Sequence, residues 1–358
     1  MNARYPQGFP LVYADSIGNR GGTGVYTRRL LAGFRDMGTD VLAVVGGRVM
    51  SPGEALQSRP FTGTTKVLWE NVLLPVKSAE FRPSLVHLPA FSGRGCSGAP
   101  VAVTLHDLAF IRNPRWFSPL KSMYYRLRFG KVAGTADVIM ADSRFTAKEA
   151  ESLLSLDPSK IRVVYLCTER FEADGGEKFR KWAEMKGEYC VHVGTIEPRK
   201  NVSALLDAWK KVRKVHGDMA LVLAGRWGRG PSSLKNRLSR EPGVFHVGEL
   251  EGGMLKSCVS GAKLLICSSF YEGFGLPPME AASAGVPSVV TPADALVEIY
   301  GEIATIADDF GADGISGAIL SALDTPGKVD RLKEFADEFT VERMVSEVIR
   351  VYGEFARE

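Results

Sequence analysis

Two glutamates eight residues apart carry the clearest potential for chemistry in this sequence. Glu272 follows an apolar run that is typical of a buried strand, and Glu280 lies in the first turn of the helix expected after it. Gly273 and Gly275 let the backbone between them approach a ligand closely. The N–H groups near Phe274–Leu276 precede a helix and have no partner inside it. Because a carboxylate accepts hydrogen bonds from neighbouring hydroxyls, the segment predicts a site for sugar hydroxyls or a phosphate.

Two basic side chains offer phosphate ligands. Arg199 and Lys200 follow another apolar run and Pro198. Arginine can fork onto phosphate oxygens, and lysine binds them as a point charge. The same pair is equally explained as a solvated basic pair before a helix. Glu280, taken alone, is better explained as an acid that complements a helix dipole.

A histidine and a glycine cluster are further candidates. His106 ends an apolar strand, where it is either a structural histidine or a ligand, and Asp107 beside it either orients the ring or caps the loop. Gly21–Gly24 lies between a strand and a helix N-terminus, where backbone amides can hold a diphosphate or where a tight turn needs glycine. The string is GGTG, and no acid follows at the spacing of a dinucleotide site, so a nicotinamide dehydrogenase is disfavoured.

The elements that must position these residues alternate between apolar strands and amphipathic helices. This pattern predicts parallel sheets covered by helices on both faces, with ligands beyond the carboxyl ends of the strands. A charged segment, 170–187, reads as a linker after which the pattern restarts. Strands are expected at 10–15, 41–47, 84–90, 100–107, 136–143, 161–167, 189–195, 219–225, 243–248, 262–269, 286–291 and 303–308. Helices are expected at 25–38, 145–156, 203–217, 275–285, 311–324, 328–338 and 341–356.

The composition bounds the class of protein. The chain has 358 residues, 45% hydrophobic and 24% charged, which indicates about two globular domains and excludes a disordered or collagen-like chain. A net charge of +4 is weak for a nucleic-acid binder. Five cysteines without a CxxC pair disfavour a zinc site or a disulfide framework and favour a reducing compartment. We find no secretory signal or spanning run, and expect a cytoplasmic protein.

The motifs around these residues resemble those of glycosyltransferase family 4, retaining enzymes with two facing Rossmann-like domains (the GT-B fold). The resemblance rests on the E-x7-E spacing within EGFGLPPMEAASAGVP and on four further blocks in the family's order, which together extend over most of the chain. These blocks are GGTGVYT at 21–27, TLHDL at 104–108, ADSRFT at 141–146 and GTIEPRKN at 194–201.

The resemblance implies an α/β fold of two doubly wound domains with a cleft between them. Residues 1–170 would form an N-terminal domain that binds the acceptor, and 171–338 a C-terminal domain that binds the nucleotide sugar. The segment 339–358 would be a helix that crosses back to the N-terminal domain.

The resemblance also assigns roles to the candidate residues. His106 would bind a hydroxyl of the donor sugar, Glu272 the donor hexose and Glu280 the ribose diol. Arg199 and Lys200 would stabilise the leaving diphosphate, with help from the backbone amides of the glycine cluster.

The remaining donor contacts are expected in loops. The nucleobase would lie near Gly225–Gly230 and Gly248–Leu250. Many relatives carry an arginine where Thr195 stands, and Arg199 would supply the missing charge. The expected catalytic residues are His106, Glu272, Lys200 and Arg199. The expected nucleotide-sugar ligands are Gly22, Thr23, Gly24, Thr195, Arg199, Lys200, Arg226, Glu249, Leu250, Glu272, Gly273, Phe274, Gly275, Leu276 and Glu280.

The implied function is retaining transfer of a hexosyl group from a nucleotide sugar to a saccharide acceptor, in bacterial surface-polysaccharide (lipopolysaccharide) biosynthesis. GDP-mannose is the leading donor, and UDP-glucose, UDP-galactose and UDP-N-acetylglucosamine are the alternatives. No cofactor or metal is expected, because the chain has no DxD tripeptide and fixed cations would replace a metal ion. The competing functions are an NDP-sugar epimerase or hydrolase and a non-catalytic sugar-nucleotide-binding subunit.

The charge is divided unevenly, and the basic half is the expected acceptor half. Residues 1–170 carry 22 Lys and Arg against 13 Asp and Glu, a net of +9, and the remainder carries 23 against 28, a net of −5. Within the basic half, 119–131 interleaves aromatic and basic residues. This stretch is either a packed helix with a core face or a surface that lies on an anionic membrane and reaches a lipid-linked acceptor. The second alternative would place the protein at the inner membrane face.

Overall fold

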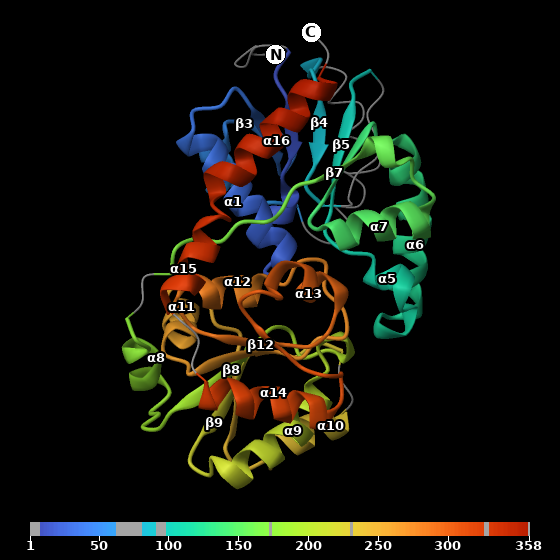
Figure 1. Ribbon diagram of the computed structural model, residues 1–358. Helices are drawn as coiled ribbons and strands as arrows, with labels where there is room; N and C mark the ends of the chain where they lie inside the picture. Colours follow the sequence, from blue (N-terminus) through green and yellow to red (C-terminus); the bar gives the residue numbers. More distant parts are fainter. Residues whose placement is uncertain are drawn as a thin grey trace. The chain divides into compact units, whose positions relative to one another are not determined.

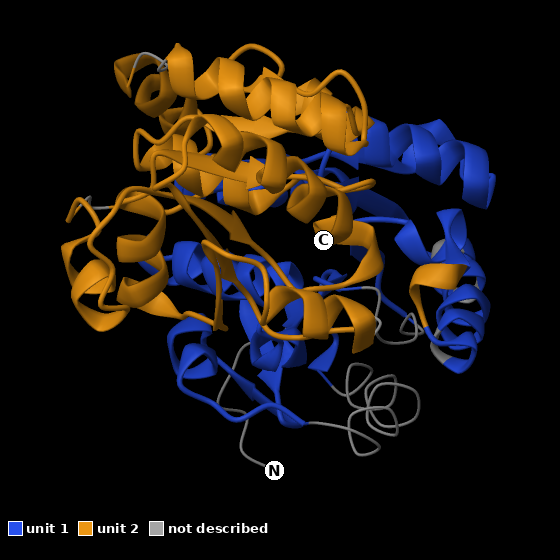
Figure 2. Cartoon of the chain, turned by 90° about the horizontal axis from the view of Figure 1, so that it is seen from below, with its two compact units in different colours: residues 1–114, 118–167, 340–358 blue, residues 115–117, 168–339 orange. Residues whose placement is uncertain are grey.

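The chain divides into two compact units (Figure 2). A computed structural model describes residues 8–61, 81–90, 98–171, 174–229, 232–325 and 329–356. Unit 1 comprises 1–114, 118–167 and 340–358, and unit 2 comprises 115–117 and 168–339. The sequence predicted domain boundaries after residues 170 and 338. In the structure, the chain passes from unit 1 to unit 2 after residue 167 and returns to unit 1 after residue 339. The predictions that concern residues 1–7, Cys96 and Gly230 lie outside the described residues.

Unit 1 is built on a seven-stranded sheet with the order β3-β2-β1-β4-β5-β6-β7. Neighbouring strands are parallel except for β3, which pairs antiparallel with β2. The strands are β1 (Leu11–Tyr13), β2 (Leu42–Val45), β3 (Arg48–Met50), β4 (Val86–Leu88), β5 (Val101–Leu105), β6 (Val138–Ala141) and β7 (Ile161–Val163). The helices described in it are α1 (Gly22–Asp36), α2 (Pro52–Leu56), α5 (Ala109–Arg112), α6 (Pro119–Thr135), α7 (Arg144–Leu154) and α16 (Val341–Phe355).

Unit 2 is built on a six-stranded parallel sheet with the order β10-β9-β8-β11-β12-β13. Its strands are β8 (Tyr189–Val193), β9 (Ala220–Ala224), β10 (Val244–Gly248), β11 (Leu264–Cys267), β12 (Ser288–Val290) and β13 (Thr305–Ile306). Its helices are α8 (Glu177–Trp182), α9 (Val202–Val215), α10 (Ser232–Leu238), α11 (Gly252–Ser260), α12 (Leu276–Ser283), α13 (Asp294–Tyr300), α14 (Ala312–Asp324) and α15 (Val329–Asp337). Short 3-10 turns η1 (Asp15–Gly18), η3 (Pro114–Trp116), η4 (Pro158–Lys160) and η5 (Pro198–Lys200) occur along the chain.

The strand order fixes where unit 2 can bind a ligand. Numbered within the unit, its strands run 3-2-1-4-5-6, the order of doubly wound nucleotide-binding sheets. The order reverses between β8 and β11, so the loops that follow these two strands diverge and leave a crevice at the carboxyl edge. The doubly wound α/β architecture predicted from the sequence is confirmed for both units.

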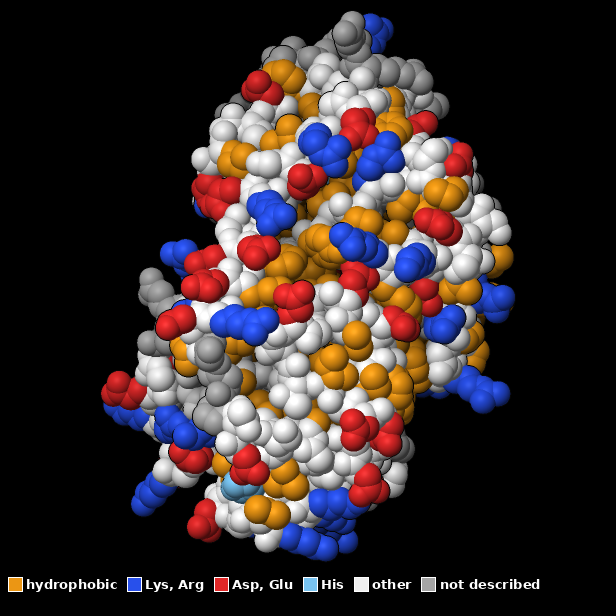
Figure 3. All heavy atoms as spheres, in the orientation of Figure 1, with side chains coloured by type: hydrophobic (Ala, Val, Ile, Leu, Met, Phe, Trp, Pro, Cys, Tyr) orange, Lys and Arg blue, Asp and Glu red, His pale blue; other side chains and the backbone are white. Residues whose placement is uncertain are grey.

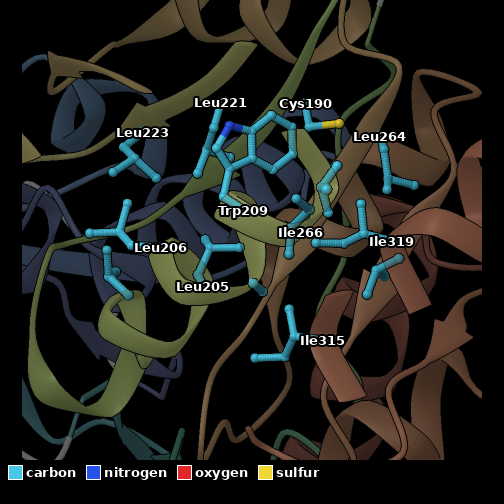
Figure 4. Close-up of a cluster of buried hydrophobic side chains, with 14 of the residues drawn as sticks. Cys190, Leu205, Leu206, Trp209, Leu221, Leu223, Leu264, Ile266, Ile315 and Ile319 are labelled. Atoms are coloured by element: carbon cyan, nitrogen blue, oxygen red, sulfur yellow. The ribbon is translucent and has the colours of Figure 1, made fainter. Parts of the chain in front are cut away.

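A core of large apolar side chains holds the helices of unit 2 on this sheet. Trp209 of α9 is fully buried among Leu221 of β9, Ile266 of β11 and Ile319 of α14 (Figure 4). Every second residue of a strand faces the same side, so β9 places Leu221 and its second neighbour against α9. In Figure 1, α9 and α14 lie on one face of the sheet, and α12 and α13 lie on the other. The core thus fixes the strand ends that carry the candidate site.

The last helix packs against the first helix of unit 1. α16 buries an apolar face at helical spacing, with Met344, Val345, Val348 and Val351 all 2% exposed or less. A Cβ atom on Gly33 of α1 would lie 2.5 Å from the side chain of Val345, so the glycine allows the close approach of the two helices. The structure therefore joins residues 341–355 to unit 1.

The structure contains several elements that the sequence did not predict, among them the helices α5, α10, α11 and α13. The expected linker 170–187 contains α8, because Phe179 is fully buried against Tyr189, with ring centres 5.4 Å apart, and its N–H donates to Ser257. The antiparallel strand β3 and the helix α2 were not predicted. None of the helices in the described ranges is long and apolar enough to span a membrane.

Candidate functional site

The two predicted cations of unit 2 lie in the loop that follows β8, at the point where the strand order reverses. The turn η5 ends in Lys200, and Asn201 then adopts a left-handed conformation with φ 53° before α9 begins. The loop is joined to the one that follows β11 by two hydrogen bonds. The Ser268 hydroxyl donates to the carbonyl of Lys200 at 2.8 Å, and the Phe270 N–H donates to the carbonyl of Arg199 at 2.9 Å. The fold therefore brings residues about seventy positions apart into one site.

The centre of this site is a buried ion pair with two cations and one carboxylate. Lys200 Nζ donates to Glu272 Oε1 at 2.5 Å, and Arg199 Nη1 donates to Glu272 Oε2 at 2.8 Å. The hydroxyl of Ser269 also donates to Oε1, at 2.7 Å. The side chains of Lys200 and Glu272 are only 10% and 8% exposed. Arg199 also pairs with Glu197 at 3.2 Å, so one cation is shared between two carboxylates.

The protonation of this cluster follows from its charges. Burial on its own would raise the pKa of Glu272, but the charges of Arg199 and Lys200 and the hydrogen bonds from Lys200 and Ser269 lower it to about 2. In β8, burial and the charge of Lys200 lower the pKa of the fully buried His192 to about 4. Glu272 is therefore ionised and His192 is neutral at neutral pH.

The loop after Glu272 presents few backbone donors. Gly275, with φ 86°, precedes α12. Because positions 277 and 278 are prolines, Gly275 and Leu276 are the residues that can offer N–H groups at this helix start. The Tyr300 hydroxyl donates to the carbonyl of Gly275 at 2.6 Å and anchors the turn. The structure thus places these predicted ligands at the same strand end as Glu272.

The second glutamate of the E-x7-E spacing is buried as well. Glu280 lies in α12 and is 7% exposed. Burial raises the pKa of Tyr300 well above its usual value, and the charges of Cys267, Glu280 and Glu272 add to this shift. Both glutamates of the spacing are therefore buried, and the charge of each contributes to the raised pKa of Tyr300.

The expected nucleobase loops adjoin one another at the same edge of the sheet. The Gly225 N–H donates to the Gly248 carbonyl at 2.6 Å, which joins the loops after β9 and β10. Arg226 and Glu249 are exposed beyond this contact, and Leu250 is half-buried. Thr195, also half-buried, packs near the same turn, where a Cβ on Gly228 would lie 2.5 Å from its methyl group. These four predicted ligands lie in the loops after β8, β9 and β10.

In unit 1, His106 follows β5 with both ring nitrogens occupied. Nδ1 is 2.7 Å from Asp142 Oδ2, and Nε2 is 2.9 Å from the carbonyl oxygen of Pro89. Asp107 does not orient the ring. Its carboxylate instead accepts the N–H of Ala109 at 3.0 Å, so of the two roles considered it takes the loop cap.

The glycine cluster of unit 1 forms the start of α1. Gly21 is the residue before the helix, and Gly22 and Thr23 occupy the first turn, where N–H groups have no partner inside a helix. The Gly24 N–H already donates to the carbonyl of Gly21 at 2.9 Å. A Cβ on Gly24 would lie 1.7 Å from the carbonyl oxygen of Asn19, so packing alone requires glycine there. The cluster therefore offers two amides for an anion, fewer than the sequence suggested.

Four residues of the two sites were missed by sequence reasoning. Ser269 and the carbonyl of Tyr271 complete the surroundings of Glu272 and Arg199. Asp142 and Pro89 hold His106. Asp142 had a signal in the sequence, since it lies at the end of a predicted strand, as His106 does. The other three carried none, because hydroxyls and carbonyls at strand ends are common.

Comparison with known proteins identifies the family and the fold. The family model described as Glycosyltransferase Family 4 matches residues 20–169, and the model described as Glycosyl transferases group 1 matches residues 175–339. In solved structures, the chain is similar to Anabaena HepE in complex with UDP-glucose, with a TM-score of 0.74 and 16% identity over 96% of this chain and 99% of that chain. These matches and the two parallel-sheet units define a glycosyltransferase with the GT-B fold.

The curated relatives narrow the class further. The chain is 29% identical to the O-antigen chain mannosyltransferase B of Escherichia coli over 62% of this chain and 60% of the relative. It is 24% identical to the MMP alpha-(1->4)-mannosyltransferase of Mycolicibacterium hassiacum over 71% of this chain and 65% of the relative. The matched part thus spans less than two thirds of either relative. The chain belongs to glycosyltransferase family 4.

Proposed function

We propose that the protein transfers a hexosyl group, mannose from GDP-mannose, to a saccharide acceptor with retention at the anomeric carbon. The observation that carries this proposal is the buried cluster of Lys200, Arg199 and Glu272 at the reversal of strand order in unit 2. A pair of preorganised cations suits a diphosphate leaving group. The names of the two mannosyltransferase relatives favour mannose.

The proposed reaction breaks the bond between the anomeric carbon and the oxygen of the β-phosphate, and forms a bond to the acceptor hydroxyl oxygen. The nucleoside diphosphate leaves, and a phosphate oxygen takes the proton of the acceptor. Lys200 and Arg199 stabilise the charge that builds up on the phosphate and do the work of a metal ion. Glu272 and Glu280 bind the hexose and the ribose, the amides of Gly22 and Thr23 add donors for the diphosphate, and unit 1 binds the acceptor.

A UDP-sugar donor is the second candidate, because the similar structure of HepE holds UDP-glucose. A thermal-shift panel separates the two. GDP and GDP-mannose are expected to raise the melting temperature more than UDP, ADP and the UDP-sugars, since a ligand that binds the folded state stabilises it by mass action. A larger shift with UDP-sugars would show that the donor is a UDP-sugar. The transferred sugar would then be glucose, galactose or N-acetylglucosamine and not mannose.

Measurement of nucleoside diphosphate release tests the reaction class. Transfer predicts release that depends on a saccharide acceptor and persists in EDTA. Equal release without acceptor would identify a hydrolase, and binding without any release would identify a non-catalytic subunit. Inhibition by EDTA would overturn the metal-independent part of the proposal, and the anomeric configuration of the product tests retention.

We further propose that the acceptor is lipid-linked and that α6 rests on an anionic membrane surface. Within the range 119–135, α6 carries four basic residues and no acidic one. On the face drawn in Figure 3, by contrast, basic and acidic side chains are interspersed. Such a helix complements an anionic bilayer in charge.

The two faces of α6 have different environments. One face packs on α5, with the rings of Phe110 and Phe129 4.3 Å apart. On the other face, Leu120, Met123 and Leu127 are 76%, 57% and 65% exposed, at the spacing of one helical stripe. The packed alternative from the sequence therefore describes one face of the helix. The core face exists, and the exposed apolar stripe is the part that we assign to the membrane.

Replacing Leu120 and Leu127 together by Gln is expected to lower the fraction of protein that sediments with phosphatidylglycerol vesicles at least 10-fold. Each leucine contributes about 1.5–3 kcal/mol when fully buried, and 1.4 kcal/mol is a factor of ten. Val215→Gln, at a valine of unit 2 that is 66% exposed, is the matched control and should sediment as the unchanged protein does. Equal sedimentation with neutral vesicles, or none with anionic ones, would rule out the membrane surface.

A further inference from the structure

His106 and Asp142 are brought together by the register of the sheet in unit 1. β5 and β6 are parallel neighbours in which Leu105 pairs with Ala141. The residues that follow each strand are His106 and Asp142, so they leave the sheet side by side. Their side chains are 19% and 2% exposed, and Nδ1 and Oδ2 are 2.7 Å apart. This contact is therefore a product of the backbone register and does not depend on a long, mobile side chain.

Both partners of the His106 ring are hydrogen-bond acceptors. Oδ2 of Asp142 faces Nδ1, and the carbonyl oxygen of Pro89 faces Nε2. A neutral imidazole has one N–H and could satisfy only one of them, whereas an imidazolium donates to both. In the described part of the chain, the other oxygen of Asp142, Oδ1, is buried without a hydrogen-bond partner. The hydrogen bond that the structure gives this carboxylate is the one from His106.

A second buried histidine on the neighbouring strand shows the opposite arrangement. His87 of β4 lies between two hydroxyls, with Nδ1 2.6 Å from Tyr352 and Nε2 2.8 Å from Thr104. A hydroxyl both donates and accepts, so a neutral ring satisfies both contacts. Burial, together with the charge of His106, lowers the pKa of His87 to about 3. The hydrogen-bond partners of the two histidines thus favour different protonation states.

The carbonyl of Pro89 and the charge of Asp107 shift the pKa of His106 in the same direction as Asp142 does. Burial on its own would lower its pKa, but the charge and hydrogen bond of Asp142, the carbonyl of Pro89 and the charge of Asp107 raise it above the usual value. The ring of Tyr26 from α1 packs edge-on, with centres 5.0 Å apart. Burial also raises the pKa of Asp142, and the charge of His106 opposes that rise.

We propose that Asp142 is a positioning residue that holds His106 as an imidazolium, with Nδ1–H on Asp142 and Nε2–H on the carbonyl of Pro89. The inference rests on the proposed function and on the contact with the donor sugar that the resemblance implies for His106. An imidazolium has no free lone pair. With both of its N–H groups engaged, His106 can offer its charge to a ligand but cannot take a proton. His106 is therefore not the base for the acceptor hydroxyl, and the proton must go to another group, such as the phosphate oxygen.

Nitrogen NMR of the histidine side chains tests this assignment on the full chain without any donor. At pH 7, His106 is expected to show both ring nitrogens in the protonated range, with a midpoint above 6.5, and His87 is expected to be neutral. His106→Asn assigns the signal. Asp142→Asn is expected to lower the midpoint by at least about one pH unit, a 10-fold loss of proton affinity, and Asp107→Asn is expected to lower it less.

A neutral His106 in the unchanged protein at pH 7 would overturn the proposal even if Asp142→Asn does not fold. An unchanged midpoint in a folded Asp142→Asn variant would overturn it as well. The transferase assay gives a second readout. In Asp142→Asn, activity should fall as the pH rises through the lowered midpoint, and Asp107→Asn should keep a profile closer to that of the unchanged protein. A chain that passes the NMR test but transfers no sugar would contradict the proposed function and leave this inference intact.

Discussion

Lys200→Ala is expected to slow glycosyl transfer about 100- to 1,000-fold at saturating donor. Removal of one preorganised donor from a site that stabilises developing charge costs this much in other enzymes. Lys200 is 8% exposed and is held at 2.5 Å from Glu272, so a solvent cation cannot readily take its place. The measurement is nucleoside diphosphate release with acceptor, in the presence of donor well above its KM.

Lys211→Ala is the control for this change. Lys211 lies on α9, the helix that follows the site, and its side chain is 42% exposed. It contacts Asp313 and should leave the rate unchanged. Retention of near-full activity by Lys200→Ala, in a protein that is still folded, would show that the cation pair does not serve the leaving group.

Glu272→Ala is expected to lower the free energy of unfolding by about 3–5 kcal/mol, because it leaves the buried Lys200 and the half-buried Arg199 without their shared carboxylate. Urea denaturation of the two proteins at pH 7 measures the difference. Glu197→Ala is the matched control. Glu197 also pairs with Arg199, at 3.2 Å, but its side chain is 26% exposed, so its loss should cost less than 1 kcal/mol.

The pH dependence of this difference has a definite sign. The pKa of Glu272 is lowered from 4.5 to about 2 in the folded protein. The contribution of Glu272 to the free energy of unfolding is therefore complete above pH 4.5 and is lost as the pH falls through about 2. The difference in the free energy of unfolding between the unchanged protein and Glu272→Ala should be constant from pH 5 to 8 and should become smaller in acid. A gap that is unchanged at pH 3 and below would contradict the ion-pair account.

A diphosphate should partly rescue the Glu272→Ala variant. Phosphate oxygens would supply the negative charge that Arg199 and Lys200 have lost, so the added stabilisation should be larger in the variant than in the unchanged protein at the same ligand saturation. Inorganic pyrophosphate is a probe that needs no knowledge of the base. An equal effect on both proteins would mean that the anion binds elsewhere.

The sequence was sufficient to predict the class of fold and the loops that carry the unit 2 site. Apolar strands alternating with amphipathic helices allow few arrangements other than parallel sheets, and ligands then belong at the carboxyl ends. Arg199, Lys200 and Glu272 could each be selected because they lie in loops that follow predicted strands. Their mutual contact could not, since it requires β8 and β11 to be neighbours although two strands separate them along the chain.

Elements that depend on a single buried side chain were missed for a physical reason. α8 is charged on most of its surface and is held by Phe179, so its composition resembles that of a linker. Asp107 was considered as the residue that orients His106, because the two are adjacent in sequence. The register of the neighbouring strands was not considered. The pairing of Leu105 with Ala141 shows that Asp142 was the better candidate.

The backbones of the loops after β8 and β9 lie in close contact. This contact decides which positions of the proposed donor site can accept a new side chain. A Cβ on Gly225 would lie 1.9 Å from the carbonyl oxygen of Gly194, and a Cβ on Gly194 would lie 3.2 Å from the side chain of Lys200. A side chain at 225 would therefore displace the loop that carries the cation. If the proposed function holds, engineering of donor choice can begin at the exposed Arg226 and continue outward, whereas these two glycines are tied to the loop that carries the cations.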